Sequence, residues 1–169
     1  PTFFDSDIKM FQNEYRQQND NSTLIADFGL TIGYKPTYAN DKKSMSHIFA
    51  RFFSDLKLKS FDVSDLYLSI EKVSNDTYLK VFDTNLIENN LKPGNSSNLL
   101  SEVKLTLSNE DYNFNTGIKA YEKLGTEKNS DRYQFILPYY DYSKIFKLEF
   151  YNGELNFSSS GANDLNETN

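Results

Sequence analysis

The stretch Leu24-Ile25-Ala26-Asp27-Phe28-Gly29-Leu30-Thr31-Ile32-Gly33-Tyr34 decides the fold class of this chain. Apolar side chains occupy every second position in it, polar or small residues fill four of the five gaps between them, and Ile25 alone breaks the alternation. Successive side chains of an extended strand point to opposite faces, so a period of two gives one apolar and one polar face. The stretch is therefore predicted to be a two-faced β-strand.

The same alternation recurs along the chain and predicts an all-β protein of about eight strands. The expected strands cover residues 8–17, 23–34, 45–59, 66–73, 99–108, 112–124, 132–151 and 154–161. Residues 1–4 are expected to be the end of a further strand that begins upstream. Pro138 cannot donate a backbone hydrogen bond, so the seventh strand is expected to bend or break there. Residues 86–98 are rich in Asn and are expected to form a flexible loop.

The alternation also sorts the side chains of each predicted strand into two rows. One row is apolar and includes Phe52, Leu68 and Val103. The opposite row is polar, and seven of its members are predicted to face the interior of a barrel: His47, Arg51, Lys57, Lys59, Glu71, Glu102 and Lys104. The two rows keep their phase through whole segments, which favours long strands whose two faces meet different environments.

Composition bounds the class of protein without deciding it. The chain has 169 residues, 38% of them hydrophobic, and a mean hydropathy of −0.64. No window approaches the roughly 20 apolar residues of a transmembrane helix, whereas a membrane barrel needs apolar residues only at alternate positions. The net charge of −6 disfavours a nucleic-acid partner, and the absence of cysteine excludes a disulfide framework or thiolate metal site in this segment.

Short and long connections alternate between the predicted strands. The short ones lie at residues 19–22, 60–65, 109–111 and 152–153, and Asn152-Gly153 is typical of a type I′ hairpin. The long ones lie at residues 35–44, 74–98 and 125–131. Bacterial outer-membrane barrels sort their connections in this way, with tight turns on the periplasmic side. The sequence therefore predicts an antiparallel meander that forms part of a large outer-membrane barrel, and both ends of the chain are interpreted as cuts.

No pattern of catalytic residues is recognisable. His47 is the only histidine, so a histidine cluster for zinc is excluded and a polar residue on a strand face is preferred to a general base. The loops lack the glycine and closing glutamate of an EF-hand, and no nucleophile elbow or phosphate-binding loop occurs. The prediction is a protein that is not an enzyme and that uses no metal or cofactor.

Three blocks of sequence resemble a known family in order and spacing. They are Asn13-Glu14-Tyr15-Arg16, then Val73-Ser74-Asn75-Asp76-Thr77-Tyr78 followed by Phe82-Asp83, and finally Asp131-Arg132-Tyr133 followed by Leu137-Pro138 and Tyr142. Together they resemble the early barrel of the LPS-assembly protein family LptD, also called Imp or OstA. The middle block, which follows Lys72, is the most specific of the three.

The resemblance implies a function in lipopolysaccharide transport. Members insert lipopolysaccharide into the outer leaflet of the Gram-negative outer membrane, carry an LptE-like lipoprotein plug, and receive lipid from a periplasmic LptA-like bridge through an N-terminal domain. By this resemblance residues 1–169 are a partial barrel domain that lacks the N-terminal domain, the first strand and the final strands. Lipid leaves such barrels through a seam between the first and last strands, which would lie outside this segment.

Other classes of function remain open on sequence alone. The main alternative is a soluble all-β module, for example a sandwich that binds carbohydrate through its 12 tyrosines. An outer-membrane enzyme or a porin-like channel is a third reading.

Overall fold

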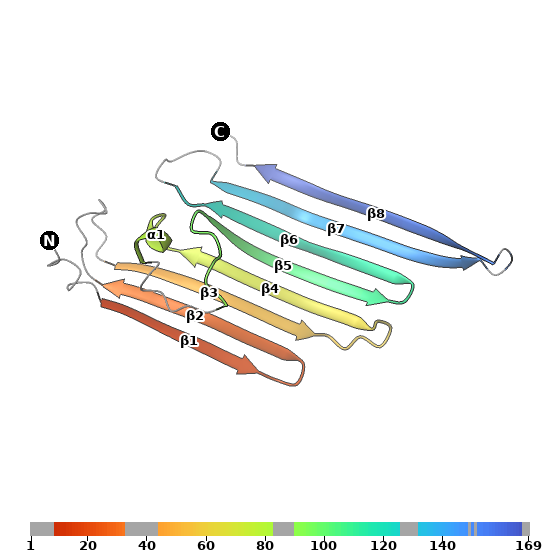
Figure 1. The fold of residues 1–169 in the computed structure, drawn as a ribbon, viewed down its shortest axis with the longest axis horizontal. Coiled ribbons are helices and arrows are strands. Elements are labelled where there is room, and N and C mark those ends of the chain that lie inside the picture. Colours follow the sequence, from red (N-terminus) through yellow and green to blue (C-terminus); the bar gives the residue numbers. More distant parts are fainter. Residues whose placement is uncertain are drawn as a thin grey trace.

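The computed structural model describes residues 9–32, 44–82, 90–125, 132–148, 150 and 152–166, which form one antiparallel sheet and a short helix (Figure 1). The elements are β1 (Lys9–Gln18), β2 (Ser22–Ile32), β3 (Ser44–Asp55), β4 (Val63–Val73), α1 (Tyr78–Phe82), β5 (Asn98–Asn109), β6 (Tyr112–Lys123), β7 (Tyr133–Leu148) and β8 (Gly153–Asn166). The strand end expected at residues 1–4 lies outside the described residues.

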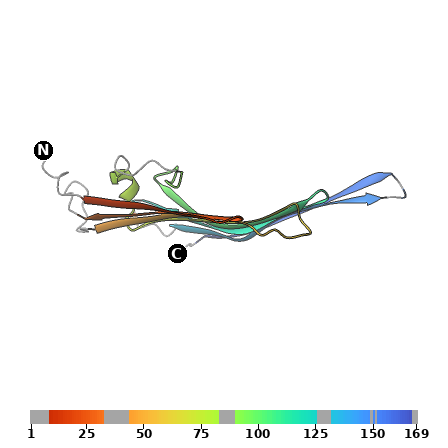
Figure 2. The same cartoon turned by 90° about the horizontal axis from the view of Figure 1, so that it is seen from below.

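The sheet is a meander in chain order. Each strand pairs with its sequence neighbours, all pairs are antiparallel, and the order runs from β1 to β8 without a crossover. Seen edge on, the strands form one thin layer with α1 on one side of it (Figure 2). Among the described residues no pairing joins β1 to β8, so both remain edge strands. The predicted eight-stranded meander is confirmed.

The strands end where local hydrogen bonds replace the sheet ladder. Asp55 Oδ1 accepts a hydrogen bond from the backbone N–H of Lys57 at 2.9 Å, and Ser64 Oγ accepts one from Leu58 at 3.0 Å. Lys57 has a φ of 51°, which a strand cannot accommodate. The expectation that the third strand continues to residue 59 is therefore wrong, and Lys57 and Lys59 lie in the turn between β3 and β4.

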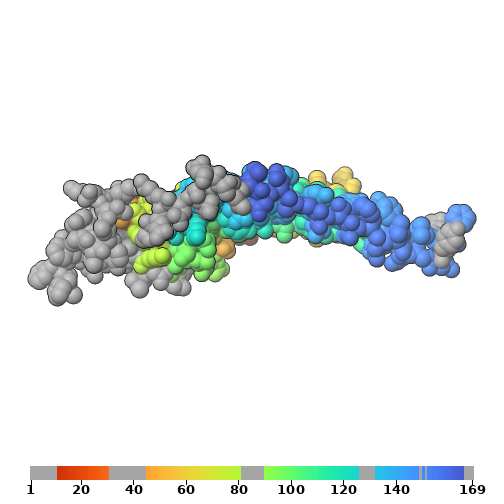
Figure 3. Space-filling view, turned by 90° about the horizontal axis from the view of Figure 1, so that it is seen from above, coloured from red at the N-terminus to blue at the C-terminus, as the bar shows by residue number. Residues whose placement is uncertain are grey.

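β7 lies within the predicted range 132–151, and its pairing with β8 is irregular at Pro138, as expected there. The register shifts between Ile136 and Tyr139, and pairing continues on both sides, so the strand does not end at the proline. β8 runs on to Asn166, opposite Gln134, through residues whose side chains carry no alternation. The β7–β8 hairpin is the longest and projects beyond the other strands in Figures 1 and 3.

The register gives the sheet two chemically distinct faces. The polar face carries Asp27, His47, Arg51, Glu71, Glu102 and Lys104, and continues through Asn115 and Lys119. The apolar face carries Phe11, Phe28, Ile48, Phe52, Leu68, Ile70, Val103, Leu105, Phe114 and Ile118, and continues into Tyr142 and Phe157. The strand ends joined by the long connections, between β2 and β3, β4 and β5, and β6 and β7, lie at one end of this sheet, and those joined by the short turns lie at the other (Figure 1).

A small hydrophobic core lies at the end of the sheet that carries the long connections. It is built mainly from the connection between β4 and β5 and from the strand ends beneath it. Its buried members are Met45, Phe49, Val73, Tyr78, Leu79, Leu91, Leu99 and Leu124. Because Leu91 and Pro93 are buried, the described part of the expected flexible loop, residues 90–98, packs against the rest of the protein.

Candidate functional site

The polar face carries two groups of interacting polar side chains on β5, β6 and β7. The Tyr139 hydroxyl donates to Glu102 Oε1 at 2.9 Å, and Lys119 Nζ lies 3.6 Å from the same oxygen. Lys119 Nζ also lies 4.9 Å from the centroid of the Tyr139 ring. Toward the turns, Thr106 Oγ1 donates to Asn115 Oδ1 at 2.9 Å. These groups are half-buried and mutually satisfied, so the face presents ordered donors and acceptors to solvent.

Five of the seven polar residues predicted to share a strand face do so. His47, Arg51, Glu71, Glu102 and Lys104 are related by the registers of β3, β4 and β5, whereas Lys57 and Lys59 lie in the turn. Glu71 accepts a hydrogen bond from the backbone N–H of Leu100 at 2.9 Å, which ties β4 to the start of β5.

His47 does not project into open space. Its Nδ1 lies 2.8 Å from the Tyr78 hydroxyl, its Nε2 lies 3.4 Å from Asp27 Oδ1, and its ring stacks on Phe49 at 4.4 Å. On the other side of the ring lies Gly29, its register partner, where a Cβ would overlap the imidazole. His47 is therefore a buried residue that ties α1 to the sheet, not an accessible acid or base.

The polar cluster around His47 also includes Gln12 of β1 and Tyr78 of α1. Gln12 Nε2 donates to Asp27 Oδ2 at 2.6 Å. Tyr78 is fully buried, and this burial raises the pKa of its phenol, so the phenol stays protonated. Four side chains from β1, β2, β3 and α1 thus lie in one polar cluster, held by the Gln12–Asp27 and His47–Tyr78 hydrogen bonds and the 3.4 Å contact between His47 and Asp27.

A second ionic cluster lies where the long connections meet the apolar face, and sequence reasoning missed it. Glu122 accepts from Lys72 Nζ at 2.6 Å and from Arg132 at 2.7 Å, and Arg132 also lies 2.7 Å from Asp76. The hydrogen bond with Glu122 is the main cause that raises the pKa of the Arg132 guanidinium. The Tyr133 ring lies 5.5 Å from Lys72 Nζ and 5.6 Å from the Arg132 guanidinium.

This cluster joins two of the sequence blocks that carry the family resemblance. Asp76 belongs to the middle block and Arg132 to the last one, and they meet 56 residues apart in sequence. The sequence shows only that each block contains charged residues, which does not specify that Asp76 pairs with Arg132.

The apolar face is broad and largely uncovered. Large hydrophobic side chains are exposed on it from β1 to β8, among them Phe11, Phe28, Leu30, Ile118, Phe146, Leu155 and Phe157. Near the short turns, four aromatic rings form a row: Phe61, Tyr112, Tyr142 and Phe157, with successive centroids 5.6, 5.4 and 5.9 Å apart.

Within the described residues no helix is long and apolar enough to cross a membrane, and no group of three or more potential metal-ligating side chains is present. No protein-family model matches the chain, and no curated protein or solved structure matches it significantly. What supports a function is therefore the chemistry of the two faces.

Proposed function

We propose that this chain is an arc of the wall of a large outer-membrane β-barrel that inserts lipopolysaccharide into the outer leaflet, as LptD-family proteins do. In this proposal the apolar face contacts lipid and the polar face lines the lumen. The protein acts by shape and surface chemistry, without a catalytic centre.

The exposed apolar face is the observation that carries the proposal. Phe28 is 45% exposed in the middle of β2, Ile118 is 44% exposed in β6 and Phe157 is 52% exposed in β8. Soluble monomers rarely expose apolar patches beyond a few hundred Å², and this face extends over all eight strands. A lipid phase would cover it without a second protein layer.

The lengths of the strands and the aromatic row agree with this environment. The strands have 10 to 16 residues, against the 9–11 that a tilted strand needs to cross a bilayer and the roughly five or six of an average soluble strand. The aromatic row at the short-turn end matches the girdles that such barrels place at the membrane interface. The alternation of short and long connections matches their sorting of turns and loops.

The polar face fits the passage of a polar, charged sugar headgroup. The array around Glu102, Lys119 and Tyr139 offers hydroxyl, ammonium and carboxylate groups in fixed positions. The proposed partners follow from the family resemblance: lipopolysaccharide as cargo, an LptE-like lipoprotein inside the completed barrel, and an LptA-like periplasmic bridge that reaches it through an N-terminal domain.

The soluble carbohydrate-binding module stays the alternative function, although the sandwich proposed for it is not the fold observed. A sandwich covers one sheet with another, and the described residues form a single sheet. The specific observation in favour of a sugar-binding role is the set of tyrosines on both faces, such as Tyr139 and Tyr142.

The proposal is tested by the position of each face relative to lipid. The chain has no cysteine, so single-cysteine variants can carry a fluorophore at one chosen site. In vesicles that contain brominated lipid, we expect strong quenching for Phe28→Cys and Ile118→Cys, and weak quenching for Lys104→Cys and Thr106→Cys. Equal quenching of the two pairs, or none in either, would exclude a lipid-facing wall.

A further inference from the structure

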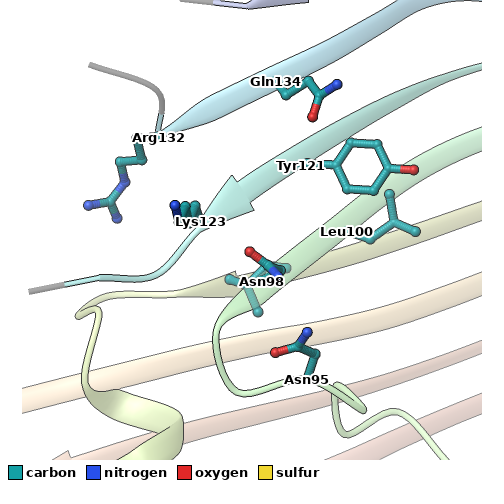
Figure 4. Close-up of a pocket in the computed structure, with 8 residues that line it drawn as sticks. Asn95, Asn98, Leu100, Tyr121, Lys123, Arg132 and Gln134 are labelled. Atoms are coloured by element: carbon teal, nitrogen blue, oxygen red, sulfur yellow. The ribbon is translucent and has the colours of Figure 1, made fainter. Parts of the chain in front are cut away.

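The polar face is hollowed at the end that carries the long connections (Figure 4). The hollow has a volume of about 460 Å³, which lies within the range of small-molecule sites. Its floor is made by three neighbouring strands, because Asn98 pairs with Lys123, Leu100 with Tyr121, and Tyr121 with Gln134. The connection before β5 forms one rim through Asn95, and Arg132 forms another.

The lining is rich in hydrogen-bond donors and positive in charge. It combines two cations, three amides and a phenol: Lys123, Arg132, Asn95, Asn98, Gln134 and Tyr121. No carboxylate is among the described residues that line it. Leu99 and Leu100 supply the apolar part of the lining.

The two cations differ in whether a carboxylate already pairs with them. Arg132 forms ion pairs with Glu122 and Asp76. Lys123 is exposed at the end of β6, and among the described residues no carboxylate pairs with it. The Arg132 guanidinium is therefore committed to the ionic cluster at the apolar face, and the hollow offers one ammonium, that of Lys123, to an anion. This local positive charge is notable in a chain whose net charge is −6.

We propose that this hollow binds a phosphorylated sugar. An anionic group meets Lys123, the planar amides of Asn95 and Asn98 match the hydroxyls of a sugar ring, and the Tyr121 ring offers a flat face. The Gln134 amide forms part of the wall and already donates to Asp164 at 3.1 Å. Where the sugar is the headgroup of a lipid, this site belongs to the proposed transport function and rests on it. The chemistry of the hollow itself is the same for a free sugar phosphate.

The test uses the whole chain folded in detergent micelles, with glucose 1-phosphate as the probe and isothermal titration calorimetry as the measurement. We expect glucose 1-phosphate to bind more tightly than either glucose or inorganic phosphate at equal ionic strength. Lys123→Gln should weaken this binding roughly ten- to hundredfold, because a charge-assisted hydrogen bond is lost. Lys59→Gln, in the turn at the opposite end, removes the same charge and should leave binding unchanged.

Two results would overturn the proposal. One is equal binding of inorganic phosphate and glucose 1-phosphate, which would leave only a non-specific attraction to cations. The other is an equal effect of Lys123→Gln and Lys59→Gln. Asn98→Ala gives a second variant, expected to weaken sugar phosphate but not inorganic phosphate, and far-UV circular dichroism confirms that each variant is folded.

A competition experiment identifies the source of the sugar. Displacement of glucose 1-phosphate by lipopolysaccharide supports a headgroup site within the transport function. Binding of glucose 1-phosphate without such displacement supports the sugar-phosphate site and separates it from transport. Lipid quenching at Phe28 and Ile118 does not depend on this hollow, so failure of the wall proposal is recognised independently.

Discussion

Replacing Phe28 by Arg tests the assignment of the apolar face most directly. Phe28 lies near the middle of β2 and is 45% exposed, so its loss removes about half of the 1.5–3 kcal/mol of a fully buried Phe, or about 1 kcal/mol. An arginine at the lipid-facing midplane of a barrel adds about 2–4 kcal/mol. The expected destabilisation in a bilayer is therefore about 3–5 kcal/mol.

Phe53→Arg is the matched control, because Phe53 is 43% exposed on the polar face. It should lose the same packing contribution of about 1 kcal/mol without the lipid penalty. Phe53 lies nearer the turn than Phe28 does. Phe52 is the adjacent residue on the apolar face, so Phe52→Arg controls for depth in the bilayer and should cost at least as much as Phe53→Arg. Urea titrations in phosphatidylcholine vesicles, followed by far-UV circular dichroism, measure all three. Equal costs for Phe28→Arg and Phe53→Arg would refute the assignment of the faces.

Three further changes probe the packing and the proposed transport. Gly29→Ala should destabilise the chain by about 2–3 kcal/mol, because the added Cβ overlaps the His47 ring and disturbs its hydrogen bond to α1, whereas Gly94→Ala, with open space around it, should change stability by less than about 0.5 kcal/mol in the same titration. Glu122→Gln should cost about 1–3 kcal/mol, since it removes the carboxylate shared by two cations; an unchanged urea midpoint would show that the cluster contributes nothing. In cells depleted of the parent protein, deletion of residues 99–124 should abolish outer-leaflet lipopolysaccharide and sensitise cells to large antibiotics, while His47→Ala should leave transport nearly intact; the opposite pattern would reopen a catalytic role.

The meander and the two faces were predictable because strand alternation is a local property of the sequence. From Leu24 to Ile32 every side chain except Ile25 has the polarity of the face on which it lies, and the paired strands keep the same phase. Strand ends were less predictable. The alternation in the sequence of β3 continues through Lys57 and Lys59. The strand nevertheless ends before them, because the side chains of Asp55 and Ser64 accept hydrogen bonds from the backbone of the turn.

The clusters could not be predicted because they join residues from distant connections. The pairing of Asp76 with Arg132 and the burial of His47 under Tyr78 depend on how the connection between β4 and β5 folds onto the sheet. The sequence shows this connection as an Asn-rich segment whose apolar residues, Tyr78 and Leu91 among them, follow no strand alternation. Their burial against β3 is a tertiary effect that no periodicity records.

The strand glycines have a consequence for how this sheet finds its correct alignment. Gly29, Gly117 and Gly161 each lie beneath the ring of a cross-strand partner, respectively His47, Tyr139 and Tyr140. A slip of one residue would turn an apolar row to the wrong side, but a slip of two would preserve both faces. The ring-over-glycine pairs oppose that second error, since the ring would then meet a Cβ. They therefore disfavour register shifts of two residues, which the alternating pattern of side chains does not distinguish from the correct register.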